Sequence, residues 1–290
     1  MKALAFDIGG TKIFSAIINE QGEIISSIEK YQTPKSLQEI KDLFSSVIRK
    51  HEDNVDKIAF STAGATNKEH TKVISSTGNL VEGYSSIDFS SLSGKKSVYV
   101  ENDANCAAWA EHIIGVSKGM ANSIMITLGT GVGGGIIINN TILKGKSGAA
   151  GEMHFKMRTD NHRKCTCGAF DCFESYASGP GLKKTAEEIT KNPNVTTYDV
   201  IDGIKTNNKE MIESFNKWQY DIINGLIGLS NIFDPDCIVL SGSMAEFTDT
   251  NFIEQQINKE IITTPTKVLK AITGNYAGMI GAALLALGEN

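Results

Sequence analysis

No hydrophobic run in the sequence approaches the roughly 20 apolar residues that a membrane-spanning helix requires. The residues from Met1 to Asp7 offer neither the apolar core nor the small-residue cleavage site of a signal peptide. The chain also has no Pro/Ser-rich linker and no low-complexity tail. Positive charge is not in excess, since the formal net charge is −5, so no basic surface favours nucleic acid or an anionic membrane. These absences predict a cytoplasmic protein that binds neither.

Cysteine is scarce and odd in number. The chain has five cysteines, and three of them, Cys165, Cys167 and Cys172, are clustered in one short segment. An odd count argues against a disulfide framework, and thiols this close together in a reducing compartment favour a local metal site. Cys106 and Cys237 are expected to be small buried apolar residues.

The length of 290 residues suits two lobes of ordinary domain size. Apolar residues alternate along the chain between strand-like runs and helical spacing. Strands are expected at residues 2–7, 13–18, 57–61, 97–101, 122–128, 136–138 and 237–242, and helices at residues 37–50, 102–112, 180–191, 218–233 and 277–287. Strands that alternate with helices imply an α/β protein with sheet cores.

One theme occurs twice in the sequence. Residues 2–18 have the pattern of a strand, a glycine turn and a second strand, and residues 122–138 repeat that order. Such a repeat suggests duplicated lobes with a nucleotide held between two glycine turns. The pattern breaks at residues 115–119, which places the lobe boundary near residue 118.

The first glycine turn follows Asp7 and contains Gly9, Gly10, Thr11 and Lys12. Glycines after a strand let backbone amides approach a phosphate closely. Asp7 at the strand end would hold Mg²⁺, directly or through water, because Mg²⁺ takes few protein carboxylates. Thr11 and Lys12 would donate to phosphate oxygens. The alternative is a hairpin turn with a lysine at its edge, since short motifs also match by chance.

The second glycine turn, Leu128–Gly135, lacks the Gly-Lys-Ser/Thr ending of a Walker A loop. The run after it has the pattern of a strand, whereas a dinucleotide fingerprint would continue as a helix. So many glycines would weaken a purely structural strand. The turn is therefore interpreted as a phosphate-binding turn with the Thr130 hydroxyl as a donor.

Between the two turns, Glu101–Glu111 has the pattern of a strand end that leads into a helix. A carboxylate there points into a cleft, and Asp103 would accept the proton of an attacking sugar hydroxyl. Phosphoryl transfer needs positioning and charge neutralisation more than a strong base, so an aspartate at a helix N-terminus can serve. The alternative is that Asn102 or Asp103 is only a helix N-cap.

These pieces, in this order and spacing, resemble the ROK family (repressor, open reading frame, kinase) of the actin/hexokinase-like ATPase superfamily. The resemblance runs nearly end to end and rests on the segments Asp7–Lys12, Ser76–Leu80, Glu101–Asn105, Leu128–Gly135, Gly148–His154, Cys165–Glu174 and Val239–Ser243. It implies a two-lobed α/β fold of the ribonuclease H-like type, with the active site in the cleft between the lobes. Residues 1–118 would form the first lobe, to which a C-terminal helix at 276–290 returns. Residues 119–275 would form the second lobe and carry a zinc-binding loop.

The resemblance also assigns roles to matching positions. Asp103 would be the catalytic base. The sugar would be bound by Asn79, Asn102, Glu152, His154 and Glu174, and the nucleotide by Gly10, Thr11, Lys12, Thr130, Gly131 and Gly242. The cofactors implied are ATP and Mg²⁺, and a homodimer is favoured. The reaction expected is phosphorylation of a hexose, with glucose first and at O6. N-acetylmannosamine, N-acetylglucosamine, mannose and fructose are the alternative acceptors.

A metal centre is expected in the second lobe. One imidazole and three thiolates suit a structural, tetrahedral Zn²⁺ with no open position, and the ligands would be His154, Cys165, Cys167 and Cys172. Such a metal would brace the loop that carries Glu174. Gly151–His154 is one residue shorter than the usual family motif, which leaves His154 open as the zinc ligand, a sugar contact, both or neither, with His162 as the alternative nitrogen ligand. Asp171 stands where the family has glycine, so the backbone of that turn is expected to differ.

Functions of other classes stay open. The same family includes sugar-sensing repressors, which carry a helix-turn-helix ahead of the first phosphate turn, whereas six residues precede Asp7 here. A regulatory protein that senses sugar without turnover would not need Asp103. An activator ATPase with an iron–sulfur cluster is the third alternative, although the cysteine spacing with an upstream histidine fits zinc better.

Overall fold

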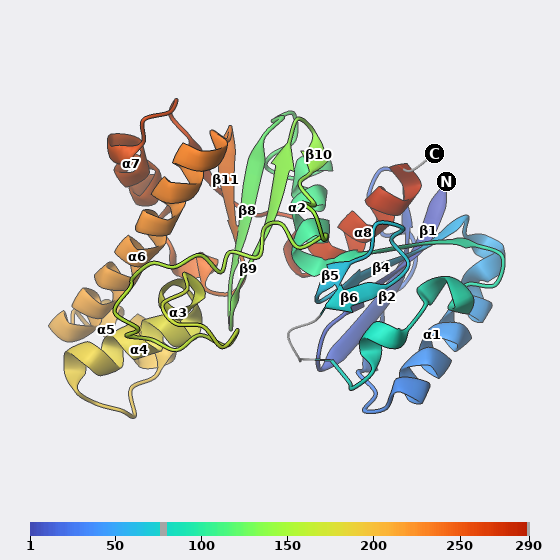
Figure 1. The fold of residues 1–290 in the computed structure, drawn as a ribbon, viewed down its shortest axis with the longest axis horizontal. Coiled ribbons are helices and arrows are strands. Elements are labelled where there is room, and N and C mark those ends of the chain that lie inside the picture. Colours follow the sequence, from blue (N-terminus) through green and yellow to red (C-terminus); the bar gives the residue numbers. More distant parts are fainter. Residues whose placement is uncertain (76–79, 289–290) are drawn as a thin grey trace. The chain divides into compact units, whose positions relative to one another are not determined.

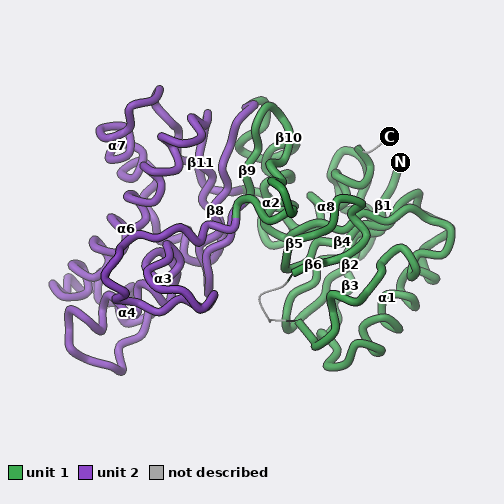
Figure 2. Tube along the Cα trace, viewed as in Figure 1, with its two compact units in different colours: residues 1–119, 135–151, 272–290 green, residues 120–134, 152–271 purple. Residues whose placement is uncertain are grey.

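The computed structural model describes residues 1–75 and 80–288. Contacts within the chain divide it into two compact units (Figure 2). Unit 1 comprises residues 1–119, 135–151 and 272–290, and unit 2 comprises residues 120–134 and 152–271. Each unit is described separately below, with the elements labelled as in Figure 1.

The sheet of unit 1 has the strand order β3-β2-β1-β4-β7. Its strands are β1 (Lys2–Ile8), β2 (Lys12–Asn19), β3 (Glu29–Gln32), β4 (Lys57–Thr62) and β7 (Ser97–Asn102). β1 and β2 form an antiparallel hairpin, whereas β1, β4 and β7 run parallel. The register places Asp7 beside Ser61 and Ser61 beside Glu101, so three polar residues meet at the carboxyl edge of the parallel strands.

Helix α1 (Leu37–His51) covers one face of this sheet. The side chain of Ser36 caps its amino end, and apolar residues at helical spacing face the sheet. Phe44 packs edge-on against Phe6 and Phe60, with ring centroids 5.4 and 5.2 Å away, and those two rings stack on each other at 4.8 Å. Each such ring pair adds roughly 0.5–1.5 kcal/mol beyond its buried area, which fixes β1 and β4 beneath the helix.

Two further helices, α2 (Asp103–Ile113) and α8 (Ala277–Gly288), pack against each other in unit 1, and α8 also contacts β1 and β4. A Cβ atom at Gly281 would overlap the backbone of Cys106, so only glycine permits this close approach of the two helices. The smaller elements of the unit are β5 (Ala65–Thr66), β6 (Val73–Ser75), β10 (Thr141–Ile142) and the 3₁₀ turns η1 (Glu52–Asn54), η2 (Tyr84–Ser86), η3 (Phe89–Leu92) and η5 (Gly274–Tyr276).

The second sheet has the strand order β10-β9-β8-β11-β12. Besides β10, its strands are β8 (Ser123–Leu128), β9 (Val132–Ile138), β11 (Cys237–Ser241) and β12 (Lys267–Lys270). β8, β11 and β12 are parallel, and the buried residues of β8 and β11 form near-continuous apolar runs, as expected for parallel strands inside a sheet, whereas only Val268 is buried in the edge strand β12. The division between the units falls within β9, after Gly134.

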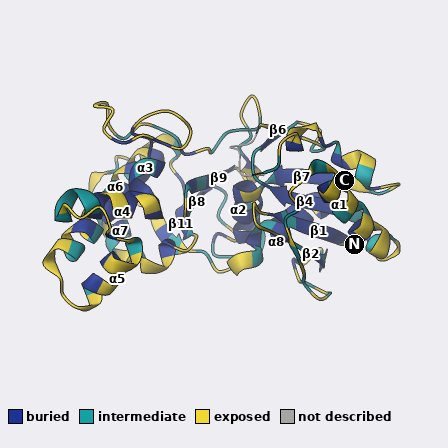
Figure 3. Ribbon diagram, turned by 90° about the horizontal axis from the view of Figure 1, so that it is seen from below, coloured by how far each residue is buried: buried dark blue, intermediate teal, exposed yellow. Residues whose placement is uncertain are grey.

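The helices of unit 2 are α3 (Glu174–Ala177), α4 (Gly179–Thr190), α5 (Thr197–Lys205), α6 (Lys209–Phe233) and α7 (Thr250–Glu260), with the 3₁₀ turn η4 (Ala245–Phe247). Trp218 of α6 is fully buried, and its indole N–H donates to the carbonyls of Ala177 and Ser178 at 3.0 and 3.2 Å. Figure 3 shows buried residues along the strands and exposed residues on the outer sides of the helices. Within the described ranges, no helix has both the length and the apolar character needed to cross a membrane.

A single buried carboxylate accepts hydrogen bonds from two segments of unit 1 that are far apart in the sequence. Glu111 of α2 has no exposed surface. Its Oε1 accepts hydrogen bonds from the amides of Ile272 and Thr273 at 2.8 and 2.7 Å and from the Thr273 hydroxyl at 2.7 Å, and its Oε2 accepts from the amide of Val116 at 2.9 Å. The chain first leaves unit 1 after Gly119 and returns to it for the last time at Ile272. The Glu111 side chain therefore holds the backbone beside the first and the last of the crossings between the units.

Candidate active site and metal centre

A largely buried carboxylate lies at the carboxyl edge of the unit 1 sheet. The Ser61 hydroxyl donates a hydrogen bond of 2.8 Å to Oδ1 of Asp7. A Cβ atom at Gly278 of α8 would come within 2.6 Å of Ser61 Oγ and 2.8 Å of Asp7 Oδ1, so any other residue there would displace these two side chains. Burial raises the pKa of Asp7 to about 6, and the bond from Ser61 only partly opposes this. A carboxylate that is costly to ionise gains from a nearby cation, which suits Asp7 to Mg²⁺.

The first glycine turn, from Gly9 to Lys12, is exposed. Thr33 holds its carbonyl groups: the Thr33 hydroxyl donates to the oxygen of Gly9 at 2.7 Å, and the Thr33 amide donates to the oxygen of Thr11 at 3.1 Å. Gly10 and Thr11 border an open cavity of about 420 Å³ within unit 1. The turn is thus fixed in shape and accessible to a ligand, as a phosphate-binding turn must be.

Asp103 begins helix α2 directly after β7. The side-chain oxygen of Asn102 caps the helix by accepting from the amides of Ala104 and Asn105 at 2.9 and 3.1 Å, and its Nδ2 donates to the oxygen of Gly64 at 3.2 Å. Asp103 Oδ1 accepts from the amide of Ala104 at 2.8 Å, and the residue is exposed. Asn102 therefore provides the cap, and Asp103 stays accessible to a substrate.

The second glycine turn connects β8 to β9. The amide of Gly129 donates to the oxygen of Gly131 at 3.0 Å, and the oxygen of Gly129 accepts from the amide of Gly179 at 2.8 Å. Thr130, at the tip of the turn, is exposed. Because Gly179 is the first residue of α4, the positive end of that helix dipole lies beside the turn, an environment that favours anions.

Gly242 follows β11 at the same edge of the sheet. It has a φ of 87°, and a Cβ atom there would lie 2.8 Å from the carbonyl carbon of Leu128 and 2.9 Å from its nitrogen. The amide of Met244 donates to the oxygen of Leu128 at 2.9 Å. The turn after β11 therefore packs directly on the end of β8, beside the second glycine turn, and the backbone there requires glycine.

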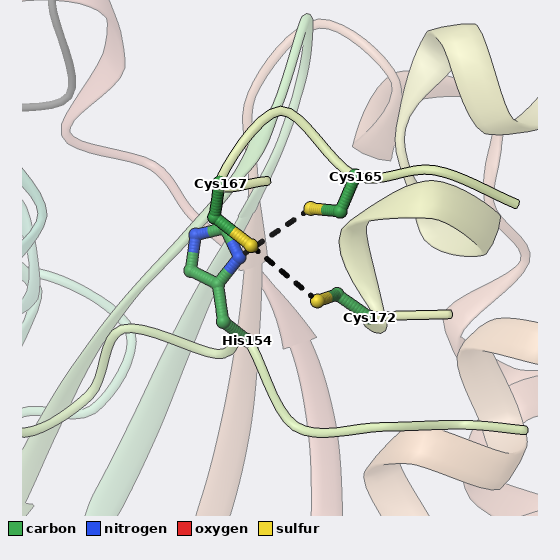
Figure 4. A group of neighbouring side chains, drawn as sticks. All are labelled: His154, Cys165, Cys167 and Cys172. Carbon is green, nitrogen blue, oxygen red and sulfur yellow. Dashed lines mark hydrogen bonds between the residues drawn. The ribbon is translucent and has the colours of Figure 1, made fainter. Parts of the chain in front are cut away.

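Four side chains of unit 2 converge in the loop region before α3 (Figure 4). They are those of His154, Cys165, Cys167 and Cys172, and their ligand atoms all lie within 4.8 Å of one another. Nδ1 of His154 is 3.7 Å from Sγ of Cys165, and the sulfurs of Cys167 and Cys172 are 3.6 Å apart. Tetrahedral zinc with its usual bond lengths separates two sulfur ligands by about 3.8 Å and a sulfur from a nitrogen by about 3.6 Å. The donor set and its spacing therefore fit a closed zinc site.

The arrangement favours His154 over His162 as the nitrogen ligand. Nε2 of His162 lies 3.1 Å from Oε1 of Glu188, outside the cluster. The shortened motif is accommodated by the backbone, because Gly151 and Met153 adopt positive φ values of 94° and 44°. A methionine rarely takes this conformation, so the chain bends sharply just before His154.

Asp171, at the position where the family resemblance predicts glycine, has a φ of 60°. Its Oδ1 accepts hydrogen bonds from the amide of Arg163 at 2.8 Å and the Tyr176 hydroxyl at 2.7 Å, and its Oδ2 accepts from the amide of His162 at 3.0 Å. Aspartate is one of the few residues that tolerate the left-handed region, and these bonds stabilise it there. The departure from glycine is accommodated by side-chain hydrogen bonds on the residue next to Cys172.

Arg163 braces the same loop from its buried side. It donates from Nε and Nη2 to the two carboxylate oxygens of Glu188 at 3.0 and 2.7 Å, and from Nη1 to the oxygen of Ser175 at 3.1 Å. Its guanidinium also lies over the ring of Tyr176, 4.5 Å from the centroid. A bidentate pair of this kind fixes geometry as well as charge, so the loop is anchored to α4 independently of the cysteines.

Glu174 lies between the cysteine loop and the second glycine turn. Its Oε2 accepts from the amide of Val132 at 3.1 Å, and its Oε1 accepts from the Thr166 hydroxyl at 2.5 Å. A Cβ atom at Gly131 would approach Glu174 Oε2 to 2.6 Å, so any other residue at this point of the turn would displace the Glu174 carboxylate. The orientation of the Glu174 carboxylate therefore depends on both segments.

The residues predicted to form the active site are divided between the two units. Unit 1 contains Asp7, Gly9, Gly10, Thr11, Lys12, Asn102 and Asp103, and unit 2 contains Thr130, Gly131, Glu152, His154, Glu174 and Gly242. Glu152 is exposed at the start of a segment of unit 2, and Asn79 lies outside the described residues. Sequence reasoning missed Ser61 and Thr33, because the strand register that brings Ser61 beside Asp7 leaves no local pattern in the sequence.

Comparisons with known proteins identify the family of the chain. The model of the ROK family matches residues 3–289. Glucokinase of Streptomyces coelicolor is 31% identical over 319 residues, which cover 98% of this chain and 96% of that protein. N-acetylmannosamine kinase of Escherichia coli is 27% identical over 296 residues, which cover 100% and 99%. The crystal structure of a ROK family glucokinase from Streptomyces griseus in complex with glucose and AMPPNP superposes with a TM-score of 0.77 at 28% identity, over 99% of both chains.

Proposed function

Because the chain belongs to the ROK family and is a sugar kinase, we propose that it transfers the γ-phosphoryl group of ATP to O6 of glucose. The fold is the two-lobed α/β fold of the actin/hexokinase-like superfamily. The observation that supports the proposal best is the accessible Asp103 carboxylate, which is held at the start of α2 beside the capping residue Asn102. Similarity to a glucokinase favours glucose over an N-acetyl-hexosamine, the acceptor in the name of the second relative.

Asp103 acts as the proton acceptor in this proposal. Phosphoryl transfer passes through a loose transition state, in which the acceptor oxygen needs orientation more than a strong base. The hydrogen bond from the Ala104 amide to Oδ1 fixes the orientation of the Asp103 carboxylate, which would then receive the proton of the sugar hydroxyl. Asn102 and Glu174 would bind the other hydroxyls, and Glu152 and His154 are further candidates.

The donor groups are those of the two glycine turns. Gly9, Gly10, Thr11 and Lys12 in unit 1, and Thr130 and Gly131 in unit 2, would bind phosphates through amides, hydroxyls and the lysine ammonium, while Gly242 would border the nucleoside. Asp7 would hold Mg²⁺, which neutralises charge on the phosphates. Zinc at the four-residue cluster would be structural, since all four of its ligands come from the protein.

An ADP-release assay with Mg·ATP tests the proposal. Glucose, mannose, fructose, N-acetylmannosamine and N-acetylglucosamine are compared at equal concentration, and the position of the phosphate in the product is read by ³¹P–¹H NMR. Glucose is expected to give the highest kcat/KM, with the phosphate on O6. A higher value for an N-acetyl-hexosamine overturns the choice of glucose.

The absence of ADP release with every sugar, from folded and zinc-loaded protein, overturns turnover itself and favours a sugar sensor. The homodimer expected from the family resemblance is tested separately by light scattering on the eluting protein.

A further inference from the structure

A second buried carboxylate lies directly before the proposed base. Glu101, at the carboxyl end of β7, has no exposed surface. Its Oε1 accepts hydrogen bonds from the amide of Asn102 at 2.9 Å and from Nδ2 of Asn105 at 3.0 Å. These two partners lie on either side of Asp103, so the Glu101 carboxylate joins the end of the strand to the first turn of α2.

The other oxygen of Glu101 forms an ion pair with Nζ of Lys144. Nδ1 of His70 lies 3.5 Å from the same oxygen and 3.2 Å from the oxygen of Val100. Burial, and then the charge of Lys144, lowers the pKa of His70 to about 4, so this ring is neutral near pH 7. The cation that balances Glu101 is therefore the ammonium of Lys144. Asp103 and Cys106 on α2 and Asp7 at the end of β1 are further ionisable groups at this edge of the sheet, and Glu69 and Tyr99 also face His70.

Lys144 comes from a well-anchored segment. The oxygen of Lys144 accepts from the amide of Ala150 at 3.2 Å, which closes the segment into a loop. Gly148 has a φ of 77°, and a Cβ atom there would overlap the carbonyl of Thr66 in β5. The ammonium group is thus presented to Glu101 by a loop that packs on neighbouring backbone, unlike the end of a freely rotating surface lysine.

We propose that Lys144 is a positioning residue for the phosphoryl acceptor: it balances the charge of Glu101, and the ionised Glu101 carboxylate orients Asn102 and Asn105 around Asp103. A buried carboxylate that loses its partner takes up a proton or draws in water, and either change weakens its ability to accept two hydrogen bonds. The start of α2 would then shift, and Asn102 and Asp103, the residues proposed to contact the sugar, would shift with it. The inference rests on the proposed role of Asp103.

The test compares Lys144→Met with Lys144→Arg and with Lys146→Met. Methionine keeps most of the aliphatic stem without the charge, and Lys146 is an exposed lysine of the same segment. In the ADP-release assay, K144M should lower kcat/KM for the sugar by roughly 10- to 100-fold. The KM for ATP should change less than about twofold. General destabilisation of the protein would not affect the sugar and leave ATP unaffected in this way. K144R should recover most of the loss, and K146M should match the wild type.

The double variant E101Q/K144M decides the mechanism. Glutamine at position 101 removes the charge that Lys144 balances. Adding K144M to E101Q should therefore lower kcat/KM for the sugar by about threefold or less, a non-additivity expected only of coupled residues. An equal loss in both backgrounds, or wild-type kinetics for K144M, overturns the proposal. The double variant also keeps the test available if K144M alone does not fold.

A measurement that does not depend on catalysis tests this inference independently of the proposed function. Amide hydrogen exchange at residues 102–105 should accelerate in K144M and not in K146M. A wild type that gives no sugar-dependent ADP release would overturn the proposed function, and the exchange comparison would still test the link between Lys144 and α2. Unchanged exchange in K144M overturns that link whatever the activity.

Discussion

The backbone amide of Val132 donates a hydrogen bond of 3.1 Å to Oε2 of Glu174. The other oxygen of the same carboxylate accepts from Thr166, one residue after Cys165. A single side chain thus connects the second glycine turn with the loop that bears the thiols. A change in the metal loop therefore reaches both the carboxylate predicted to bind sugar and the turn predicted to bind phosphate.

The first prediction concerns the nitrogen ligand of the metal. His154→Asn should reduce bound zinc from about one equivalent to a small fraction, because three thiolates alone leave the tetrahedral site open. His162→Asn should keep the metal, since His162 contacts Glu188 outside the cluster. Elemental analysis of the two purified variants is the measurement. Loss of zinc from the His162 variant with retention in the His154 variant would reverse the assignment.

The second prediction concerns Asp103. Asp103→Asn keeps the size of the side chain but removes the proton acceptor, so kcat should fall by about 10²- to 10⁴-fold while sugar binding persists. Turnover is measured by ADP release and binding by calorimetry. Asp42→Asn, on the exposed side of α1, is the matched control. Near-normal turnover of the Asp103 variant would remove this residue from the mechanism.

The third prediction separates conformation from hydrogen bonding at Asp171. Asp171→Ala loses the bonds to Arg163, His162 and Tyr176 and forces alanine into a φ of 60°. Asp171→Gly loses the same bonds without the strain. Alanine should lower the Tm of the zinc-loaded protein by about 5–10 °C and glycine by a few degrees less. Calorimetry gives the order, and a glycine variant as unstable as the alanine variant would show that the strain is unimportant.

The fourth prediction is a pH dependence of stability that originates in His70. Its folded pKa, lowered to about 4 by burial and by Lys144, is below the ordinary value of 6.5. The neutral ring is favoured in the fold, so its stabilisation is complete above pH 6.5 and is lost as the pH falls toward 4. Linkage gives about 3 kcal/mol, reduced to roughly 1–2 kcal/mol because solvent screens a partly accessible ring.

Urea unfolding of wild type and His70→Gln at pH 7.5, 6 and 5 measures this effect. The difference in unfolding free energy between the two proteins should shrink as the pH falls. The comparison cancels the contribution of Asp7, whose raised pKa acts in the opposite direction. A difference that is constant with pH would contradict the assignment to His70.

The secondary structure was predictable where local signals were strong. The helix expected at residues 37–50 is α1, because an N-cap serine precedes a clear apolar stripe. The helix expected from Trp218 begins earlier, at Lys209, because the polar residues of its first turns face solvent and hide its apolar positions. Helix α5 was missed, although Thr196 and Asp199 form a capping box that marks its start.

The chemistry of the site was predictable at positions that carry motifs, and unpredictable where side chains meet from distant segments. The glycine turns and the cysteine cluster are contiguous in the sequence, so their residue types could be read directly. The pairing of Ser61 with Asp7 depends on the register of parallel strands, and that of Lys144 with Glu101 depends on the packing of a loop against β5. Neither relationship leaves a local pattern. The roles of the individual sugar- and nucleotide-binding residues stay predictions.

The hydrogen bonds of Glu111 indicate which nearby positions can change during evolution and which cannot. Three of its four hydrogen bonds come from backbone amides, those of Val116, Ile272 and Thr273, which every residue except proline supplies. The side chains at positions 116 and 272 are therefore free to diverge among relatives, while Glu111 itself is not. A family alignment should show this carboxylate retained beside two variable positions from which proline alone is missing.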